Sequence, residues 1–189
     1  MNYQNLTFGE LLELKKALSN INNILTQKLT LASIEKLFED DFIERDQALQ
    51  MIGSVVQKSV NANGYDIESK DNNNKGWKNI VVEVKCNLPN HGKLLANQID
   101  NLKDDVNGLW NGKGGLETTN FIKILVVFDD GTSVVYNSLE HTFENKISEY
   151  VKGTLDTKRV YVIALTTPDI EGLLNRMQNN FFQTAIINE

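Results

Sequence analysis

An almost unbroken apolar run, Phe-Ile-Lys-Ile-Leu-Val-Val-Phe at residues 121–128, is the strongest constraint on how this chain can fold. The run is too short to cross a membrane, and its β-branched and aromatic side chains favour a strand. Apolar residues stand at both odd and even positions, so both faces of that strand must be covered. The sequence therefore predicts a central sheet with helices on its two faces.

Helical spacing and strand alternation divide the rest of the chain. A capping-box pattern from Thr7 to Glu10 opens a helix whose leucines recur up to Leu25, and a short helix follows at 31–39. Further helices are predicted at 41–63, 93–110 and 139–151, and Pro168 opens a terminal one. Strands are predicted at 65–68, 80–85 and 159–165. This order predicts an α/β fold in which a mixed central β-sheet is flanked by helices.

Size and composition favour one compact unit, in which an N-terminal helical segment at 1–40 precedes a domain at 41–189. The single cysteine, Cys86, excludes an intramolecular disulfide and a cysteine-based zinc site. No apolar run is long enough to span a membrane, and residues 1–10 lack a signal-peptide pattern. We therefore expect a cytoplasmic protein that does not act on membranes.

The net charge of −6 argues against a protein that binds nucleic acid by bulk electrostatic attraction. The distribution of charge weakens that objection. Residues 64–115 hold seven lysines and seven acidic residues, and the acidic excess lies in 1–63 and 116–189.

The predicted strand at 80–85, Ile-Val-Val-Glu-Val-Lys, carries the chemistry. Alternation places Glu83 and Lys85 on one face, with the Val84 carbonyl between them. Asp66 opens the preceding predicted strand, and a hairpin would bring it beside Glu83. Two carboxylates and a carbonyl suit Mg²⁺, which keeps waters that can act as nucleophiles. The Lys85 ammonium can hold such a water and stabilise an attacked phosphate.

These residues resemble the motif of the PD-(D/E)xK nuclease superfamily, in which an acidic residue opens one strand and Glu/Asp-x-Lys lies on the next. Asp66 matches the first element, with Tyr65 at the proline position, and residues 83–85 match the second. Gln98, on the following helix, resembles the glutamine of RecB-like members, and Glu44 resembles the auxiliary acidic residue of the family. The resemblance covers about residues 41–166 and implies a restriction-endonuclease-like αβββαβ core.

The resemblance also implies roles. Asp66, Glu83, Lys85 and Gln98 would form the catalytic set, while Asp66, Glu83, Glu44 and the Val84 carbonyl would ligate Mg²⁺. The implied activity is Mg²⁺-dependent hydrolysis of phosphodiester bonds in double-stranded DNA. The compact chain favours a type II restriction endonuclease acting as a homodimer. Two alternatives stay open: a repair or junction-resolving nuclease of the same fold, and a catalytically silent protein-interaction module.

The identity of the first carboxylate is also open. Asp71 lies 12 residues before Glu83 and competes with Asp66 for that position, and Glu68 faces the same way as Asp66. The glycine-rich run at 112–115, which contains Lys113, lacks the ending of a phosphate-binding loop. We interpret it as a helix-ending loop or a DNA contact.

Overall fold

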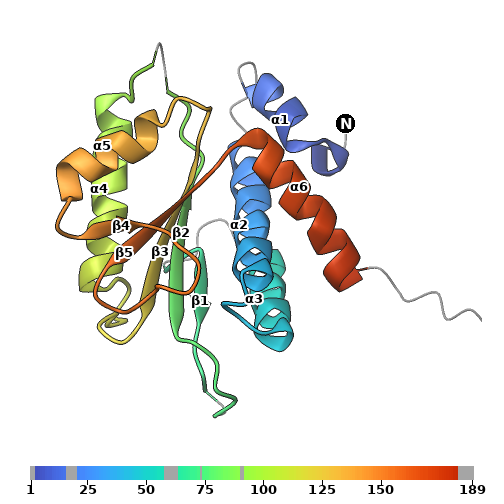
Figure 1. Cartoon of the computed structure of the whole chain (residues 1–189). Helices are drawn as coiled ribbons and strands as arrows, with labels where there is room; N and C mark the ends of the chain where they lie inside the picture. The colour runs from blue at the N-terminus through green and yellow to red at the C-terminus, as the bar shows by residue number, and fades with distance from the viewer. Residues whose placement is uncertain (1–2, 16–20, 58–63, 73, 90–91, 183–189) are drawn as a thin grey trace, which may run out of the picture.

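The computed structural model describes the chain except for residues 1–2, 16–20, 58–63, 73, 90–91 and 183–189. A five-stranded sheet lies between two layers of helices (Figure 1), with strand order β1-β2-β3-β5-β4. The strands are β1 (Ile67–Ser69), β2 (Ile80–Lys85), β3 (Ile122–Phe128), β4 (Ile147–Glu149) and β5 (Val160–Leu165). β1 pairs antiparallel with β2, whereas the pairs β2–β3, β3–β5 and β4–β5 are parallel. The predicted α/β fold with a mixed sheet is confirmed.

Two separate apolar cores cover the faces of the sheet. One contains the apolar side chains of α1 (Phe8–Lys15), α2 (Asn22–Glu39), α3 (Arg45–Gln57) and α6 (Thr167–Met177), packed on the even-numbered residues of β2 and β3. The other contains those of α4 (Ala96–Asn111) and α5 (Val134–Phe143), packed on odd-numbered residues such as Val81 and Leu125. All seven residues of β3 are buried, which confirms the two-sided coverage that the apolar run predicted.

The N-terminal helices differ from their predicted boundaries. Thr7 and Glu10 do form the capping box, since each accepts the backbone N–H of the other. The first helix, however, ends at Lys15 among the described residues, and α2 then runs without a break from Asn22 to Glu39. Short 3-10 and π-helical turns at Tyr3–Asn5 and Gln178–Phe182 lie outside these helices. The buried side chains of α1 and α2 belong to the same core as the sheet, so the described residues of the segment 1–40 pack as an integral part of that helical layer.

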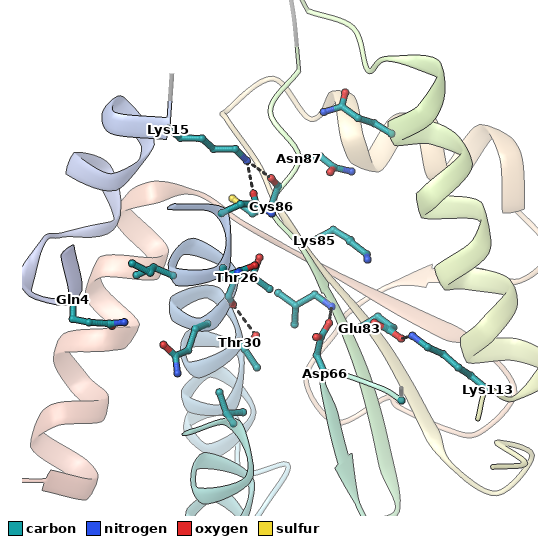
Figure 2. A pocket seen from close by; sticks show the side chains of 18 residues that line it. Gln4, Lys15, Thr26, Thr30, Asp66, Glu83, Lys85, Cys86, Asn87 and Lys113 are labelled. Carbon is teal, nitrogen blue, oxygen red and sulfur yellow. Dashed lines mark hydrogen bonds and ion pairs between the residues drawn. The ribbon is translucent and has the colours of Figure 1, made fainter. Parts of the chain in front are cut away.

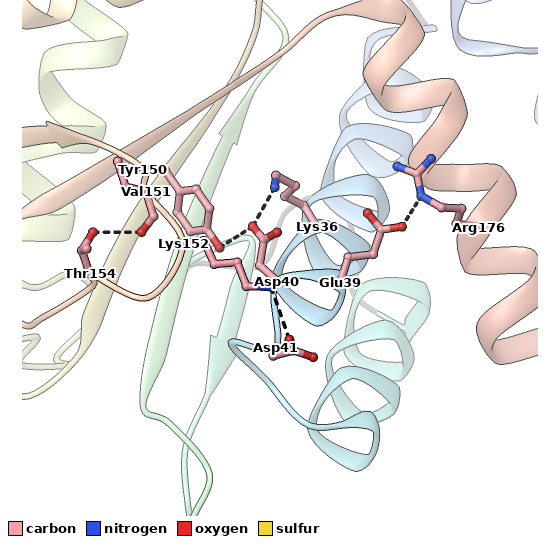
Figure 3. Close-up of polar contacts among 9 residues, drawn as sticks. All are labelled: Lys36, Glu39, Asp40, Asp41, Tyr150, Val151, Lys152, Thr154 and Arg176. Atoms are coloured by element: carbon pink, nitrogen blue, oxygen red, sulfur yellow. Dashed lines mark hydrogen bonds and ion pairs between the residues drawn. The ribbon is translucent and has the colours of Figure 1, made fainter.

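The predicted helix at 139–151 is wrong in its second half. α5 spans Val134–Phe143, and residues 147–149 form the edge strand β4 beside β5. The side chains that follow β4 tie this edge to the end of α2 (Figure 3). Tyr150 donates to Asp40 at 2.8 Å, Asp40 also accepts from Lys36, and Lys152 pairs with Asp41. The contacts of Tyr150 and Lys152 with the end of α2 join residues about 110 positions apart, so local helical spacing could not reveal them.

No helix in the described part of the chain is long and apolar enough to cross a membrane.

A buried carboxylate in the helical layer leads to a stability prediction. Glu35 of α2 is 0% exposed; one oxygen accepts from Asn180, and the other has no hydrogen-bond partner within the described residues. Burial raises the pKa of Glu35 above its ordinary value of 4.5, although Asn180 and Arg176 oppose the rise. A raised pKa in the folded state means that the folded protein binds more protons. The stabilising effect of protonation is therefore present below about pH 4.5 and is lost as the pH rises through the folded-state pKa.

Glu35→Gln should raise the free energy of unfolding at pH 8 by about 1 kcal/mol, because it removes a buried charge and keeps an acceptor for Asn180. Urea unfolding at pH 8 and pH 4 is the measurement, and the gain should shrink at pH 4. Glu39→Gln is the matched control one turn later: Glu39 is ion-paired with Arg176 (Figure 3), so its replacement should not stabilise the protein. Equal effects of the two substitutions at both pH values would contradict the prediction.

Candidate active site

A cleft of about 570 Å³ lies between the N-terminal half of α2, the C-terminal end of β2 and the helix α4 (Figure 2). We refer to it as the α2–α4 cleft. Five residues selected from the sequence line it: Asp66, Glu83, Val84, Lys85 and Gln98. Residues far apart in the chain therefore meet in one cavity.

The cleft is open because β1 is short. β1 pairs only with residues 80–82 of β2, so the last three residues of β2 extend beyond it. Asp66, immediately before β1, binds the edge of β2 that β1 leaves unpaired: its Oδ2 accepts the backbone N–H of Val84 at 2.7 Å. The N–H and C=O of one strand residue point to the same side. The Val84 carbonyl is thus directed toward this edge and the cleft.

The register brings Asp66 and Glu83 together. Ile67 is opposite Val82, which places the preceding Asp66 opposite Glu83 on the neighbouring strand. Their charges interact, since Asp66 is one of the groups that raise the pKa of Glu83. The hairpin inferred from the sequence thus brings the two carboxylates to the same end of the sheet.

Glu83 is the most buried acidic group of the cleft, with 3% of its surface exposed. Burial raises its pKa to about 7, and Asp66 adds to the rise. The Lys113 ammonium, which is ion-paired with Glu83 Oε1, opposes it. A buried carboxylate of this kind requires a cation nearby to stay ionised at neutral pH.

Lys85 lies in the cleft but pairs with a different carboxylate. Its Nζ is 3.2 Å from Oδ2 of Asp105, a buried residue of α4. Burial by itself lowers the pKa of Lys85, but Asp105, with smaller effects from Glu83 and Asp66, makes the net change upward. Lys85 is therefore a firmly charged ammonium at the wall of the cleft.

Gln98 connects the start of α4 to the chain that follows β2. Its Oε1 accepts the N–H of Leu95, and its Nε2 donates to the carbonyl of Leu88. These bonds tie Leu88 to the start of α4 and hold Gln98 in the lining of the cleft. In this structure its contacts are those of a positioning residue.

Glu44 and Asp71 are not brought to the cleft. Gln47, one helical turn after Glu44, bonds Ser69 and the Lys78 carbonyl, at the opposite end of the β1–β2 ladder from Asp66. Glu44 itself is exposed. Asp71 accepts the backbone N–H groups of Lys75 and Gly76 and so shapes the hairpin turn. Glu68 is paired with Lys70 and does not line the cleft either.

Three charged residues of this region were not selected from the sequence. Asp105 pairs with Lys85. Lys113 pairs with Glu83, and Lys15 donates to the Cys86 carbonyl at 3.0 Å (Figure 2). Asp105 could have been selected from the sequence. It lies in the apolar stripe of α4 between Leu102 and Leu109, where a buried carboxylate would need a partner. Lys113 lies in the glycine-rich loop, whose closure toward Glu83 cannot be inferred from spacing.

The donors of the cleft fit a hard divalent cation. Asp66, Glu83 and the Val84 carbonyl supply oxygen ligands only, as Mg²⁺ prefers, with coordination completed by water. Among the described residues, no group of three or more His, Cys, Asp or Glu side chains is arranged as a metal site. The third nearby carboxylate, Asp105, is engaged with Lys85. An ion here would therefore depend on two carboxylates.

Comparison with known proteins adds no relative: no family model, curated protein or solved structure matches this chain.

Proposed function

We propose that this protein is an Mg²⁺-dependent endonuclease of the PD-(D/E)xK class that hydrolyses phosphodiester bonds of double-stranded DNA. The observation that carries the proposal is that the motif residues meet in one cleft. Asp66 is the residue just before β1, Glu83 and Lys85 come from β2, and all three line one cleft. An incidental charge pair on the exposed face of a strand would not produce a buried glutamate inside a cavity.

In the proposed reaction, Asp66, Glu83 and the Val84 carbonyl would hold Mg²⁺. When bound, the ion supplies Lewis acidity and a water that ionises more readily than bulk water. Asp66 is held in place by its bond to the Val84 N–H, and Glu83 is held by its burial. The Lys85 ammonium orients the attacking water and stabilises negative charge that develops on the phosphate.

The order of elements supports the same class. The hairpin β1–β2 is followed by α4 and then by β3, which is parallel to β2, in agreement with the second half of the expected core. One expected element differs: no strand precedes β1 within the described ranges. Within the class we favour a type II restriction endonuclease acting as a homodimer, with a repair or junction-resolving nuclease as the alternative.

A catalytically silent interaction module is the competing function. The net charge of −6 favours it, as does the ion pair that already satisfies Glu83. An active nuclease should nick or cut supercoiled plasmid in Mg²⁺ and leave it intact in EDTA, as resolved on an agarose gel. Discrete fragments from phage DNA would support restriction, whereas a smear would indicate non-specific cleavage. Intact DNA under all conditions, together with a folded protein, would favour the silent module.

A further inference from the structure

The glycine-rich loop that follows α4 places a second lysine at the carboxylate pair. Lys113 Nζ is ion-paired with Glu83 Oε1 (Figure 2), while Lys85, the lysine of the motif, pairs with Asp105. Both lysines line the cleft. The cation in direct contact with the buried glutamate is thus the one that the motif does not contain.

The loop is built to hold Lys113 there. Gly112 adopts φ +92°, and a Cβ at this position would overlap the Leu116 carbonyl, so only glycine allows the close approach. Lys113 and Leu116 then exchange two backbone hydrogen bonds that close the loop. The side chain passes over Gly108, where a Cβ would meet Lys113 Cδ at 3.6 Å. A larger side chain at Gly108 would crowd this path.

Tyr65 also contacts the Lys113 ammonium. The Lys113 Nζ lies 5.5 Å from the centroid of the Tyr65 ring, within the range of a cation–π interaction. The Tyr65 hydroxyl donates to the Gly108 carbonyl at 2.8 Å, which fixes the ring against α4. The Tyr65 ring, the absence of a side chain at Gly108 and the closed loop therefore together hold the Lys113 ammonium beside Glu83.

We propose that Lys113 is the resident counter-cation of Glu83, that a divalent ion at the carboxylate pair displaces it, and that the released ammonium then holds the substrate phosphate. Glu83 is shared between the two cations, and like charges repel strongly in a partly buried site. The inference rests on the metal site of the proposed function. It makes Lys113 a substrate-binding residue of that site and assigns a role to a loop that the motif leaves unexplained.

Displacement can be measured without any assay of DNA cleavage. In the metal-free protein, the reductive methylation of Lys113 should be slow, and saturating Mg²⁺ should accelerate it severalfold, as followed by peptide mass spectrometry. Lys103 on α4 is the internal control, because its side chain is similarly exposed, 43% against 37%, and it is ion-paired with Asp100, away from Glu83. Glu83→Gln should give fast methylation of Lys113 with or without Mg²⁺.

A substitution tests the competition directly. Lys113→Gln should bind Mn²⁺ roughly tenfold more tightly at pH 8.5, because a repelling charge has been removed. The loss of free-Mn²⁺ signal in electron paramagnetic resonance is the readout. Lys103→Gln should bind like the wild type. The same Lys113→Gln protein should cleave DNA more slowly despite its tighter metal binding, a combination that a purely structural lysine would not give.

Each outcome is decisive. Unchanged Lys113 methylation in a protein that binds Mg²⁺, or unchanged or weaker Mn²⁺ binding by Lys113→Gln, would overturn the inference. A wild-type protein that takes up neither ion would overturn it too. Displacement of Lys113 in a protein that cleaves no DNA would leave the inference standing and reject the nuclease function.

Discussion

Asp66→Asn is expected to lower Mg²⁺-dependent DNA cleavage by roughly 10³-fold, or about 4 kcal/mol of transition-state stabilisation. The asparagine oxygen can still accept the Val84 N–H, so the edge of β2 stays capped and the protein stays folded. What the substitution removes is one of the two carboxylates that line the cleft among the described residues. Initial rates of plasmid linearisation over a range of Mg²⁺ concentrations measure the effect.

Asp71→Asn is the matched control. Asp71 is also a turn-proximal aspartate before β2, but its oxygens accept backbone N–H groups of the hairpin turn. Its replacement should leave cleavage within about twofold of the wild-type rate, because it lies outside the cleft. If Asp71→Asn were inactive and Asp66→Asn active, the first carboxylate would be Asp71 and the geometric assignment would be wrong.

The parts of the fold that were predicted correctly depend on local pattern. The apolar run of β3 requires cover on both faces wherever it packs, and the alternation in β2 fixes which side chains share a face. The pairing of Asp66 with Glu83 followed from one further assumption, a hairpin between adjacent strands. The patterns of β2 and β3 are set by neighbouring residues, and the hairpin joins two strands that follow one another in the chain, so the sequence alone was enough to predict these features.

The parts that were missed depend on tertiary contact. β4 is only three residues long and is a strand because β5 lies beside it. Glu44 is kept away from the cleft by the way α3 packs, which its own helical spacing does not determine. Lys113 lies 30 residues after Glu83 and reaches it from a loop that is closed by backbone hydrogen bonds between Lys113 and Leu116. In each case the deciding partner is distant in the sequence.

Lys85→Met should abolish most of the cleavage, and the structure adds a complication that the motif alone does not raise. The substitution leaves Asp105, which is buried, without its ion-pair partner. We therefore expect a loss of stability of about 1 to 3 kcal/mol in addition to the loss of cleavage, because an unpaired buried carboxylate is costly. Activity lost through partial unfolding must be separated from activity lost through chemistry.

The double variant Lys85→Met/Asp105→Leu makes that separation. Replacing both partners with apolar side chains removes the unpaired charge, so urea unfolding should recover most of the lost stability. Cleavage should not recover, because no ammonium remains at that wall of the cleft to orient water and stabilise the phosphate. Binding to DNA, measured by gel shift in Ca²⁺, should persist in both variants. Recovery of cleavage together with stability would show that Lys85 serves only to neutralise Asp105. The catalytic role proposed for Lys85 would then be rejected.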